Sequence, residues 1–413
     1  MKIYQVGGAV RDILMRQTPH DIDYVVVGAT PAAMLAAGYK QIKKDIPVFI
    51  NPEDGREYAL ARRETKTGCR HDDFRFETSP NITLAEDLIR RDFTCNAIAR
   101  DPQTGKIIDP YNGTADIHAK VLRHINAEHF VEDPLRVLRL CRFTAQLDFT
   151  PAPETLELAR QMTATGMLAH LSGDRIRQEL FKALDTPRPD VFFRTAIRCG
   201  ALAAVLPEIN QLFATPERPD YHPEGNSGEH TLLCLQHAVG QSLKVKLAVL
   251  LHDLGKTVTP PDILPAHHGH AEAGIPLVRK LCRRLNIPNE LSNFAVLCCA
   301  EHMKLTLVRQ MRLSKLIKLI TRLQRNHDNN IPDFIHVCTA DFLGRRIPIT
   351  SEQRQTLAAD IRYLRRAARI LNHIKATDMP NFSSLSKDKT FAEHWHNFQI
   401  EMLRRNLKST YPA

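Results

Sequence analysis

The chain has 413 residues, a length that predicts about two to four domains with hydrophobic cores of their own. Hydrophobic residues make up 43% of it and charged residues 25%, which excludes bulk disorder and collagen-like repeats. The net charge of +10 favours a polyanionic partner, although a charge excess alone is weak evidence.

The nine cysteines form no Cys-x-x-Cys pair, which argues against a zinc ribbon or a thioredoxin motif. The N-terminal residues lack the apolar stretch of a signal peptide, and no apolar run approaches the ~18–20 residues of a membrane helix. We therefore expect a cytoplasmic protein with free thiols and no membrane contact.

Short strands alternate with capped helices in the first third of the chain. The β-branched run at 24–27 predicts a strand, and Thr30 followed by Pro31 predicts the start of a helix. Thr83 and Glu86 form a capping box, which predicts a second helix there. After about residue 132 helical periodicity replaces the strand signals, as in DPLRVLRLCRFTAQL.

A glycine turn and two aspartates form the first group of candidate functional residues. Gly7 and Gly8 allow backbone N–H groups to approach a phosphate, and Arg11 can bind phosphate oxygens. Asp21 and Asp23 would point to the same face at the start of a strand. Such close carboxylates repel unless a cation lies between them, and Mg²⁺ prefers carboxylate and phosphate oxygens. An isolated Asp-x-Asp would more simply be a solvated turn, but the glycines and Arg11 favour a metal site.

This segment resembles the first signature of the polymerase-β-type nucleotidyltransferases, in the branch of class II CCA-adding tRNA nucleotidyltransferases and bacterial poly(A) polymerases. Four further segments are similar to motifs of that family, in the same order. They are RRDFTCNA at 90–97, the DPYNGTAD turn at 109–116, EDPLRVLR at 132–139 and the segment 175–179, which matches the last motif, on the neck helix. The five matches together are highly specific.

The resemblance implies template-independent addition of C, C and A to tRNA 3′ ends, from CTP and ATP, with release of pyrophosphate. Asp21 and Asp23 would then be the catalytic residues and bind two Mg²⁺ ions. Glu57, in a predicted strand, is a weaker candidate for a third carboxylate. An exposed strand residue is an equally good interpretation of Glu57.

Arginines and glycines of the same motifs are candidates for binding the nucleotide. Gly8, Arg11 and Arg91 would hold the triphosphate. An ion pair between Arg91 and Asp87, four residues earlier on a helix, is the alternative for Arg91.

Asp133 would cap a helix that begins at Pro134, and Arg136, Arg139 and Arg142 would share one face of that helix. In the family, the residues at the positions of Asp133 and Arg136 read the base of the incoming nucleotide, and we include Arg139 among the nucleotide-binding residues. Arginine has only donors and ionised aspartate only acceptors, so the pair can complement cytosine or adenine. Local salt bridges along an arginine-lined helix are the alternative.

The second group of candidates resembles the HD phosphohydrolase superfamily, in which histidines and aspartates surround a metal. A lone helical histidine is usually structural, but the HDLGK segment with correctly ordered partners favours a metal site. The candidate ligands are His230, His252, Asp253 and Asp341, with His270 and His302 as candidates for a second metal. The neighbouring His267 and His268 leave that last assignment open. The metal would be a divalent transition metal, with Ni²⁺ as one candidate.

In enzymes of this kind the HD segment brings phosphatase, 2′-nucleotidase and 2′,3′-cyclic phosphodiesterase activities. Three alternatives stay open for the whole chain: a poly(A) polymerase that uses ATP alone, an HD phosphohydrolase whose head only binds RNA, and a non-catalytic RNA-binding scaffold. The partners that we expect are tRNA, CTP and ATP, and the chain would be a monomer or a homodimer.

Basic helices near the end of the chain would suit an RNA backbone, although a solvated face explains any single arginine equally well. Their basic residues are Arg362, Arg365, Arg366, Arg369, Arg404, Arg405 and Lys408.

We therefore expect an α+β protein, with an α/β nucleotidyltransferase head followed by an all-α neck, body and HD domain. The predicted boundaries are 1–131 for the head, 132–206 for the neck and body, 207–227 for a Pro- and Gly-rich linker, 228–345 for the HD domain and 346–413 for the basic tail.

Overall fold

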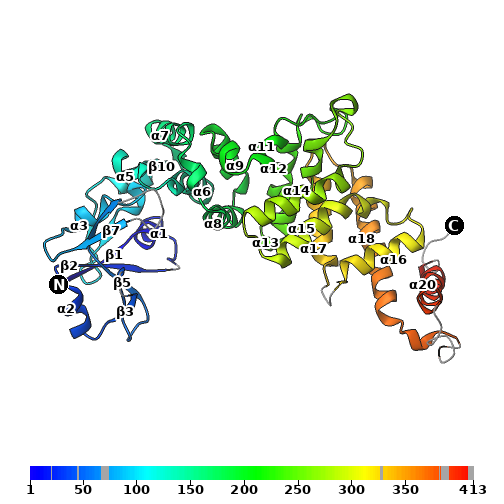
Figure 1. Cartoon of the computed structure of the whole chain (residues 1–413), viewed down its shortest axis with the longest axis horizontal. Helices are drawn as coiled ribbons and strands as arrows, with labels where there is room; N and C mark the ends of the chain where they lie inside the picture. Colours follow the sequence, from blue (N-terminus) through cyan, green and yellow to red (C-terminus); the bar gives the residue numbers. More distant parts are fainter. Residues whose placement is uncertain are drawn as a thin grey trace. The chain divides into compact units, whose positions relative to one another are not determined.

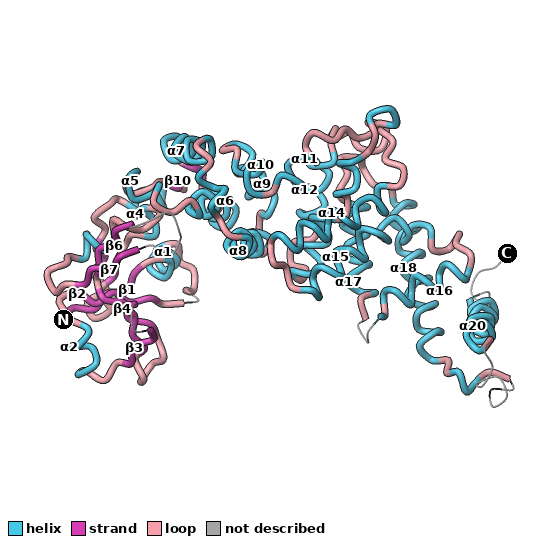
Figure 2. The backbone as a smooth tube through the Cα atoms, in the orientation of Figure 1, coloured by secondary structure: helices cyan, strands magenta, loops and turns pink. Residues whose placement is uncertain are grey.

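The computed structural model describes residues 1–19, 21–43, 46–66, 74–325, 329–380, 382 and 390–407. The chain divides into two compact units, Met1–Leu206 and Pro207–Ala413. In the part that the structure describes, all β-strands belong to the first unit (Figure 2). The chain thus has the predicted α+β class.

A mixed β-sheet organises the head. Its centre is β2 (Asp23–Val27), which pairs antiparallel with β1 (Lys2–Val6) and parallel with β5 (Glu57–Leu60). The complete order is β3 (Lys40–Lys43), β4 (Ile46–Ile50), β5, β2, β1, β8 (Ala99–Arg100) and β9 (Ile107–Ile108). Val25 and Val26 lie in two different hydrophobic clusters, because successive side chains of a strand point to opposite faces. Both faces of β2 are therefore buried.

Local capping signals place the helices of the head. Thr30 accepts a hydrogen bond from the backbone of Ala33 at the start of α2 (Pro31–Ala36). Thr83 and Glu86 form the predicted capping box of α3 (Leu84–Leu88). The first helix, α1 (Gly8–Leu14), follows Gly7, whose φ of 74° is a left-handed value that favours glycine. A two-stranded sheet of β6 (Arg62–Lys66) and β7 (Phe74–Thr78) completes the head.

Helices dominate the remainder of the first unit. They are α4 (Gly113–Ala119), α5 (Ala127–Val131), α6 (Leu135–Leu147), α7 (Pro153–Ala164), α8 (Gly173–Leu184), α9 (Pro189–Arg198) and α10 (Ala201–Val205). Helix α6 packs against α8 and α9, and a buried ion pair of 2.6 Å between Arg142 and Glu179 joins it to α8. The neck is not entirely helical, because strand β11 (Thr150–Pro151) pairs with β10 (Val121–Leu122).

Helices also build the second unit (Figure 1). They are α11 (Pro207–Leu212), α12 (Ser227–His237), α13 (Leu243–Leu251), α14 (His270–Arg284), α15 (Asn289–Glu301), α16 (Leu313–Leu323), α17 (Ile331–Leu343), α18 (Ser351–His373) and α20 (Phe391–Leu407). Helix α13 is the central one, since residues 245–251 are all buried. It packs against α12, α15 and α17.

The segment predicted as a linker, 207–227, is largely folded into the second unit. It contains α11, and the carboxylates of Glu217 and Glu224 are buried. The proposed linker therefore contains ordered structure. The division of the chain into five parts stays a prediction. Among the described residues, no helix combines the length and the apolar character needed to cross a membrane.

Candidate functional sites

A cavity of about 500 Å³ lies in the first unit, between the Gly7–Gly8 turn, residues 90–96 and helices α6 and α8. Six arginines and three aspartates are among the residues that line it. Its charge is therefore positive, which suits a polyanion such as a triphosphate.

The glycine turn closes one wall of this cavity. A Cβ atom at Gly7 would lie 2.9 Å from Nη1 of Arg91 and 3.9 Å from Oδ2 of Asp23. A side chain at position 7 would therefore displace Arg91. Because glycine has no side chain, the turn, the guanidinium of Arg91 and the carboxylate of Asp23 can lie close together.

The structure brings Asp23 together with Glu57. Tyr24 and Tyr58 are register partners on β2 and β5, with their rings stacked 4.5 Å apart. Asp23 and Glu57 each precede one of these tyrosines, so both point to the opposite face of the sheet. There they line an adjoining cavity of about 250 Å³, together with Arg91.

Asp21 does not lie on the same strand as Asp23, although the sequence predicted that it would. Strand β2 begins at Asp23, so the alternation that would align the two aspartates does not extend to Asp21. Asp21 is exposed and lines neither of the two cavities. Its role as a metal ligand stays a prediction.

A hydrogen-bonded network connects residues from three of the sequence motifs. Arg11 donates to Oδ1 of Asn96 at 2.7 Å, and Asn96 donates to Oδ1 of Asp92 at 3.0 Å. Arg139 donates to Oδ2 of Asp92 from Nε at 2.8 Å and from Nη2 at 2.6 Å. Burial opposes ionisation of Asp92, but Arg139 and Asn96 outweigh it and lower its pKa to about 2. Asp92 is therefore an anion that positions arginines.

Arg91 lines the cavity and retains an unused hydrogen-bond donor among the described residues. The alternative ion pair with Asp87 exists, but it spans 3.8 Å, whereas Arg90 lies 2.8 Å from Asp87. Nε of Arg91 is buried and has no hydrogen-bond partner among the described residues. An incoming phosphate could accept from this group.

Asp133 is held by an arginine that the sequence analysis did not single out. Nη2 of Arg175 donates to both carboxylate oxygens of Asp133, at 2.9 and 2.8 Å. Asp133 also accepts from the backbone of Leu135, where α6 begins, one residue after the predicted start. Arg136 instead donates to the carbonyl oxygens of Arg90 and His129. The available signal for Arg175 was its place at the start of the last motif.

The DPYNGTAD segment contacts Thr94, which lies two residues before Asn96 in the cavity lining. A Cβ atom at Gly113 would lie 2.2 Å from the carbonyl oxygen of Thr94, so only glycine permits this approach. The carboxylate of Asp109 caps the turn by accepting from Gly113 and Thr114, and Asp116 accepts from the hydroxyl of Thr94 at 2.7 Å. The motif thereby fixes residues 94–96.

In the second unit, four histidines share one orientation. In each, Nδ1 contacts a backbone carbonyl oxygen, so that Nε2 is the ring nitrogen that faces a carboxylate, either of Asp341 or of Asp253. The pairs are His230 with Gly344 at 2.9 Å, His252 with Val249 at 2.7 Å, His270 with His267 at 2.7 Å and His302 with Cys298 at 3.1 Å. Such carbonyl contacts are typical of histidines that bind a metal.

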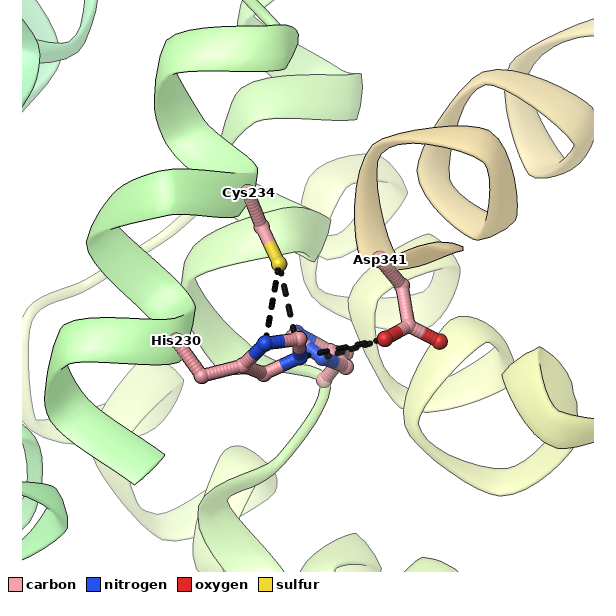
Figure 3. A group of neighbouring side chains, drawn as sticks. His230, Cys234 and Asp341 are labelled. Carbon is pink, nitrogen blue, oxygen red and sulfur yellow. Dashed lines mark hydrogen bonds and ion pairs between the residues drawn. The ribbon is translucent and has the colours of Figure 1, made fainter. Parts of the chain in front are cut away.

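The first part of this centre joins α12 to α17. Nε2 of His230 lies 3.1 Å from Oδ1 of Asp341, and Nε2 of His252 lies 3.8 Å from the same oxygen. Cys234, one turn after His230, belongs to the same group of closely spaced metal-ligating atoms. Figure 3 shows His230 and Cys234 on one helix and Asp341 approaching from another. Cys234 is a neighbour that the sequence analysis did not single out.

The second part surrounds Asp253. Its Oδ1 lies 3.4 Å from Nε2 of His270 and 3.5 Å from Nε2 of His302, and its Oδ2 lies 3.2 Å from Nε2 of His252. Burial lowers the pKa of His270, which favours the neutral imidazole that a metal needs. In His302 burial also lowers the pKa, but Asp253 outweighs it and raises the value overall.

Two unsatisfied atoms test whether a metal fits here. Nε2 of His252 and Oδ1 of Asp253 are buried, and neither makes a hydrogen bond among the described residues, although each lies within an ion-pair distance of 3.2 to 3.5 Å of its neighbours. Buried acceptors without hydrogen bonds are costly, and imidazole nitrogen with carboxylate oxygen is a donor set that suits transition metals. The residues therefore fit a metal ion.

The glycine and lysine of HDLGK have structural partners. A Cβ atom at Gly255 would lie 1.8 Å from the carbonyl oxygen of His270, so glycine permits the contact with α14. Lys256 lies 2.7 Å from Asp253 and 2.7 Å from Glu217. The sequence did not indicate a role for Glu217, because this residue lies in the Pro- and Gly-rich segment that was predicted to be a linker.

The structure also separates the clustered histidines. His267 contacts the hydroxyl of Thr259 at 2.7 Å and the carbonyl oxygen of Pro216 at 2.9 Å. His270, rather than His267, faces Asp253. The four predicted HD residues thus come together with His270 and His302.

Three family models match the chain. They are the poly A polymerase head domain over residues 3–123, the probable RNA and SrmB-binding site of polymerase A over 148–213, and the HD domain over 228–341. A multifunctional CCA protein of Acinetobacter baumannii is 45% identical over 386 residues, which cover 92% of each chain.

Solved structures show the same fold. A Bacillus stearothermophilus CCA-adding enzyme in complex with CTP has a TM-score of 0.60 and 21% identity, and covers 98% of this chain and 94% of its own. A Thermotoga maritima CCA-adding enzyme complexed with tRNA has a TM-score of 0.62 and 20% identity, and covers 99% and 91%. With these matches and both sites in place, the chain belongs to the multifunctional CCA protein family of class II tRNA nucleotidyltransferases.

Proposed function

We propose that the first unit adds C, C and A to the 3′ ends of tRNA, using CTP and ATP and releasing pyrophosphate. The observation that carries this proposal is that one cavity is lined together by the Gly7–Gly8 turn, Asp23, Arg91 and the Asp133–Arg175 pair. The relative named a multifunctional CCA protein supports it. So do the CTP and tRNA complexes of enzymes with this fold.

The cavity separates phosphate recognition from base recognition. Arg91 and Arg11, with the backbone of the glycine turn, would bind the triphosphate. Asp133 can accept from the exocyclic amino group of cytosine or adenine, and Arg136 or Arg139 can donate to their ring acceptors. Uracil and guanine present the opposite pattern at these positions, so they would be rejected.

Asp23 and Asp21 would hold Mg²⁺, with Glu57 as the third carboxylate beside Asp23. When bound, Mg²⁺ promotes attack by the 3′-hydroxyl and neutralises charge on the departing pyrophosphate.

Incorporation of labelled CTP or ATP into tRNA that lacks its CCA end tests this function. We expect C, C and A to be added in that order and Asp23→Asn to abolish addition, with His252→Ala as the unaffected control. Addition of A alone, with CTP ignored, would instead identify a poly(A) polymerase. Unchanged CTP incorporation by Asp23→Asn would refute the proposal.

We further propose that the second unit is a metal-dependent phosphohydrolase that acts on phosphates at RNA ends, as 2′,3′-cyclic phosphodiesterase, 2′-nucleotidase and phosphatase. The unsatisfied His252 and Asp253 atoms carry this proposal, and the HD-domain match supports it. His230, His252, Asp253 and Asp341 would hold a divalent transition metal such as Ni²⁺. The metal, when bound, lowers the pKa of a water molecule and makes it a nucleophile towards phosphorus.

Hydrolysis of 2′,3′-cyclic AMP by metal-depleted enzyme, resupplied with Ni²⁺, Mn²⁺ or Mg²⁺ in turn, tests the second proposal. His252→Ala should abolish hydrolysis and leave CTP incorporation unchanged. Loss of both activities together would contradict two independent sites.

The tRNA would also contact the basic face of α18. Arg362, Arg365 and Arg369 are exposed on it, whereas Arg366 donates to the backbone of Asn406 in α20 at 2.5 Å. Arg404 and Arg405 are exposed on α20, and Lys408 lies outside the described residues. Replacing the three exposed arginines of α18 by alanine should weaken tRNA binding and flatten its salt dependence. An unchanged salt dependence would exclude this face.

A further inference from the structure

The second unit contains a cavity of about 360 Å³ whose lining includes Asp253, His270, His302 and Asp341. We infer that two other residues of this cavity select a nucleotide as its substrate. Arg345 binds a phosphate oxygen, and Tyr221 stacks on the nucleobase. This inference rests on the phosphohydrolase proposed above and names the residues that determine its specificity.

The backbone on both sides of Arg345 is fixed. The carbonyl oxygen of Gly344 lies 2.9 Å from Nδ1 of His230, and the backbone N–H of Arg346 donates to Glu224 at 3.2 Å. A Cβ atom at Gly344 would lie 2.3 Å from Sγ of Cys234, so this turn packs tightly onto α12. Arg345 therefore follows the helix that carries Asp341 in a defined position and lines the same cavity.

Arg345 has a donor that the protein leaves unused. Its Nε is buried, without a hydrogen-bond partner among the described residues. A buried, unpaired donor is costly, and a phosphate oxygen would satisfy it with a charge-assisted hydrogen bond. Lys256 also lines the cavity, but its ammonium group already contacts Asp253 and Glu217, both at 2.7 Å. The geometry therefore favours Arg345 as the phosphate ligand.

Tyr221 lies on a closed loop at the same cavity. A β-bridge between Pro216 and Asn226 closes the loop, and the N–H of Glu217 donates to the carbonyl oxygen of Gly225 at 3.1 Å. The tyrosine is nevertheless 53% exposed. A large aromatic ring held at a cavity without being buried is available to a ligand.

The surroundings of Tyr221 suit a base. The guanidinium carbon of Arg218 lies 5.0 Å from the centre of its ring, and Met303, which is 50% exposed, lines the same cavity. Aromatic, guanidinium and thioether groups form the kind of surface on which nucleobases stack. A site for inorganic phosphate or for small phosphate esters would need none of them.

Steady-state kinetics with two substrates separate the two roles. For 2′-AMP, Tyr221→Ala should raise KM about tenfold or more, as loss of base stacking predicts, and Tyr221→Phe should stay near wild type. For glycerol 2-phosphate, which has no base, Tyr221→Ala should change nothing. Arg345→Met should raise KM for both substrates, whereas Arg346→Ala, an exposed neighbour, should alter neither.

The inference is overturned if Tyr221→Ala leaves the ratio of the two KM values unchanged, or if Arg345→Met behaves as Arg346→Ala does. If the wild type hydrolyses neither substrate, the phosphohydrolase proposal fails, and calorimetric binding of 2′-AMP in the presence of Ni²⁺ decides the inference by itself. Weaker binding by both Tyr221→Ala and Arg345→Met, compared with Arg346→Ala, would sustain it. Equal binding by all four proteins would refute it.

Discussion

Arg139 on α6 donates two hydrogen bonds to the same oxygen of Asp92, at 2.8 and 2.6 Å. Asn96 extends this pair to Arg11, so motifs that are far apart in the sequence share one network. The arginine proposed to bind phosphate, Arg11, and the arginine proposed to bind the base, Arg139, are thus both connected to a single buried carboxylate. Disturbing Asp92 should affect the whole cavity.

Replacing Asp92 by asparagine should make the head less stable at neutral pH. The pKa of Asp92 is lowered from 3.8 to about 2, so its ionisation stabilises the folded state above about pH 4, and this stabilisation is lost as the pH falls towards 2. The shift corresponds to about 2 kcal/mol. Urea unfolding from pH 2 to 7 should show a wild-type advantage that disappears in acid. A difference between the two proteins that is independent of pH would contradict this explanation.

Arg175→Ala should impair nucleotide selection rather than folding. Asp133 would lose the two hydrogen bonds that orient it, and we expect kcat/KM for CTP to fall about tenfold, with weaker discrimination against UTP. Arg175→Lys should recover part of the loss. Single-nucleotide incorporation measures both effects, with Arg177→Ala on the same helix as a control, because Arg177 pairs with Asp174. Equal losses in the two alanine variants would mean that Asp133 needs no orienting partner.

Features that depend on neighbouring residues could be predicted from the sequence in detail, whereas contacts between distant residues could be predicted only where family motifs indicated them. Thr30 and Thr83 cap their helices as predicted, because a cap is decided within four residues. The proximity of Glu57 to Asp23 depends on the register between β2 and β5, which no local pattern encodes. The burial of Glu217 could not be predicted, because the prolines and glycines around it are typical of loops and do not indicate which residues are buried.

The HD centre shows the same contrast. Motif order was enough to predict that His230, His252 and Asp341 would meet. The choice between His267 and His270 needed the packing of α14 against Gly255, which directs His270 towards Asp253. Spacing alone could not decide it, because both histidines precede or begin the same helix.

Gly255→Ala tests whether that packing maintains the second site without involving the first. A Cβ atom there would lie 1.8 Å from the carbonyl oxygen of His270 and 2.6 Å from the backbone nitrogen of Gly274. Neither backbone atom can move aside as a side chain would, so we expect a destabilisation of about 3 kcal/mol. His270 and Asp253 should separate, and hydrolysis of 2′,3′-cyclic AMP should fall while CTP incorporation persists.

Differential scanning calorimetry of the whole chain should show the destabilisation by Gly255→Ala as a lower melting temperature of the second unit alone, with the unfolding transition of the first unit unchanged. Gly240→Ala is the matched control, because Gly240 has a φ of 83° but no atom within 4 Å of the added Cβ, so its cost is about 1–2 kcal/mol of backbone strain. A shift for Gly255→Ala no larger than for Gly240→Ala would show that the contact with α14 relaxes easily. A shift of both transitions would show that the two units, Met1–Leu206 and Pro207–Ala413, unfold together, because a clash confined to one of two independent units cannot destabilise the other.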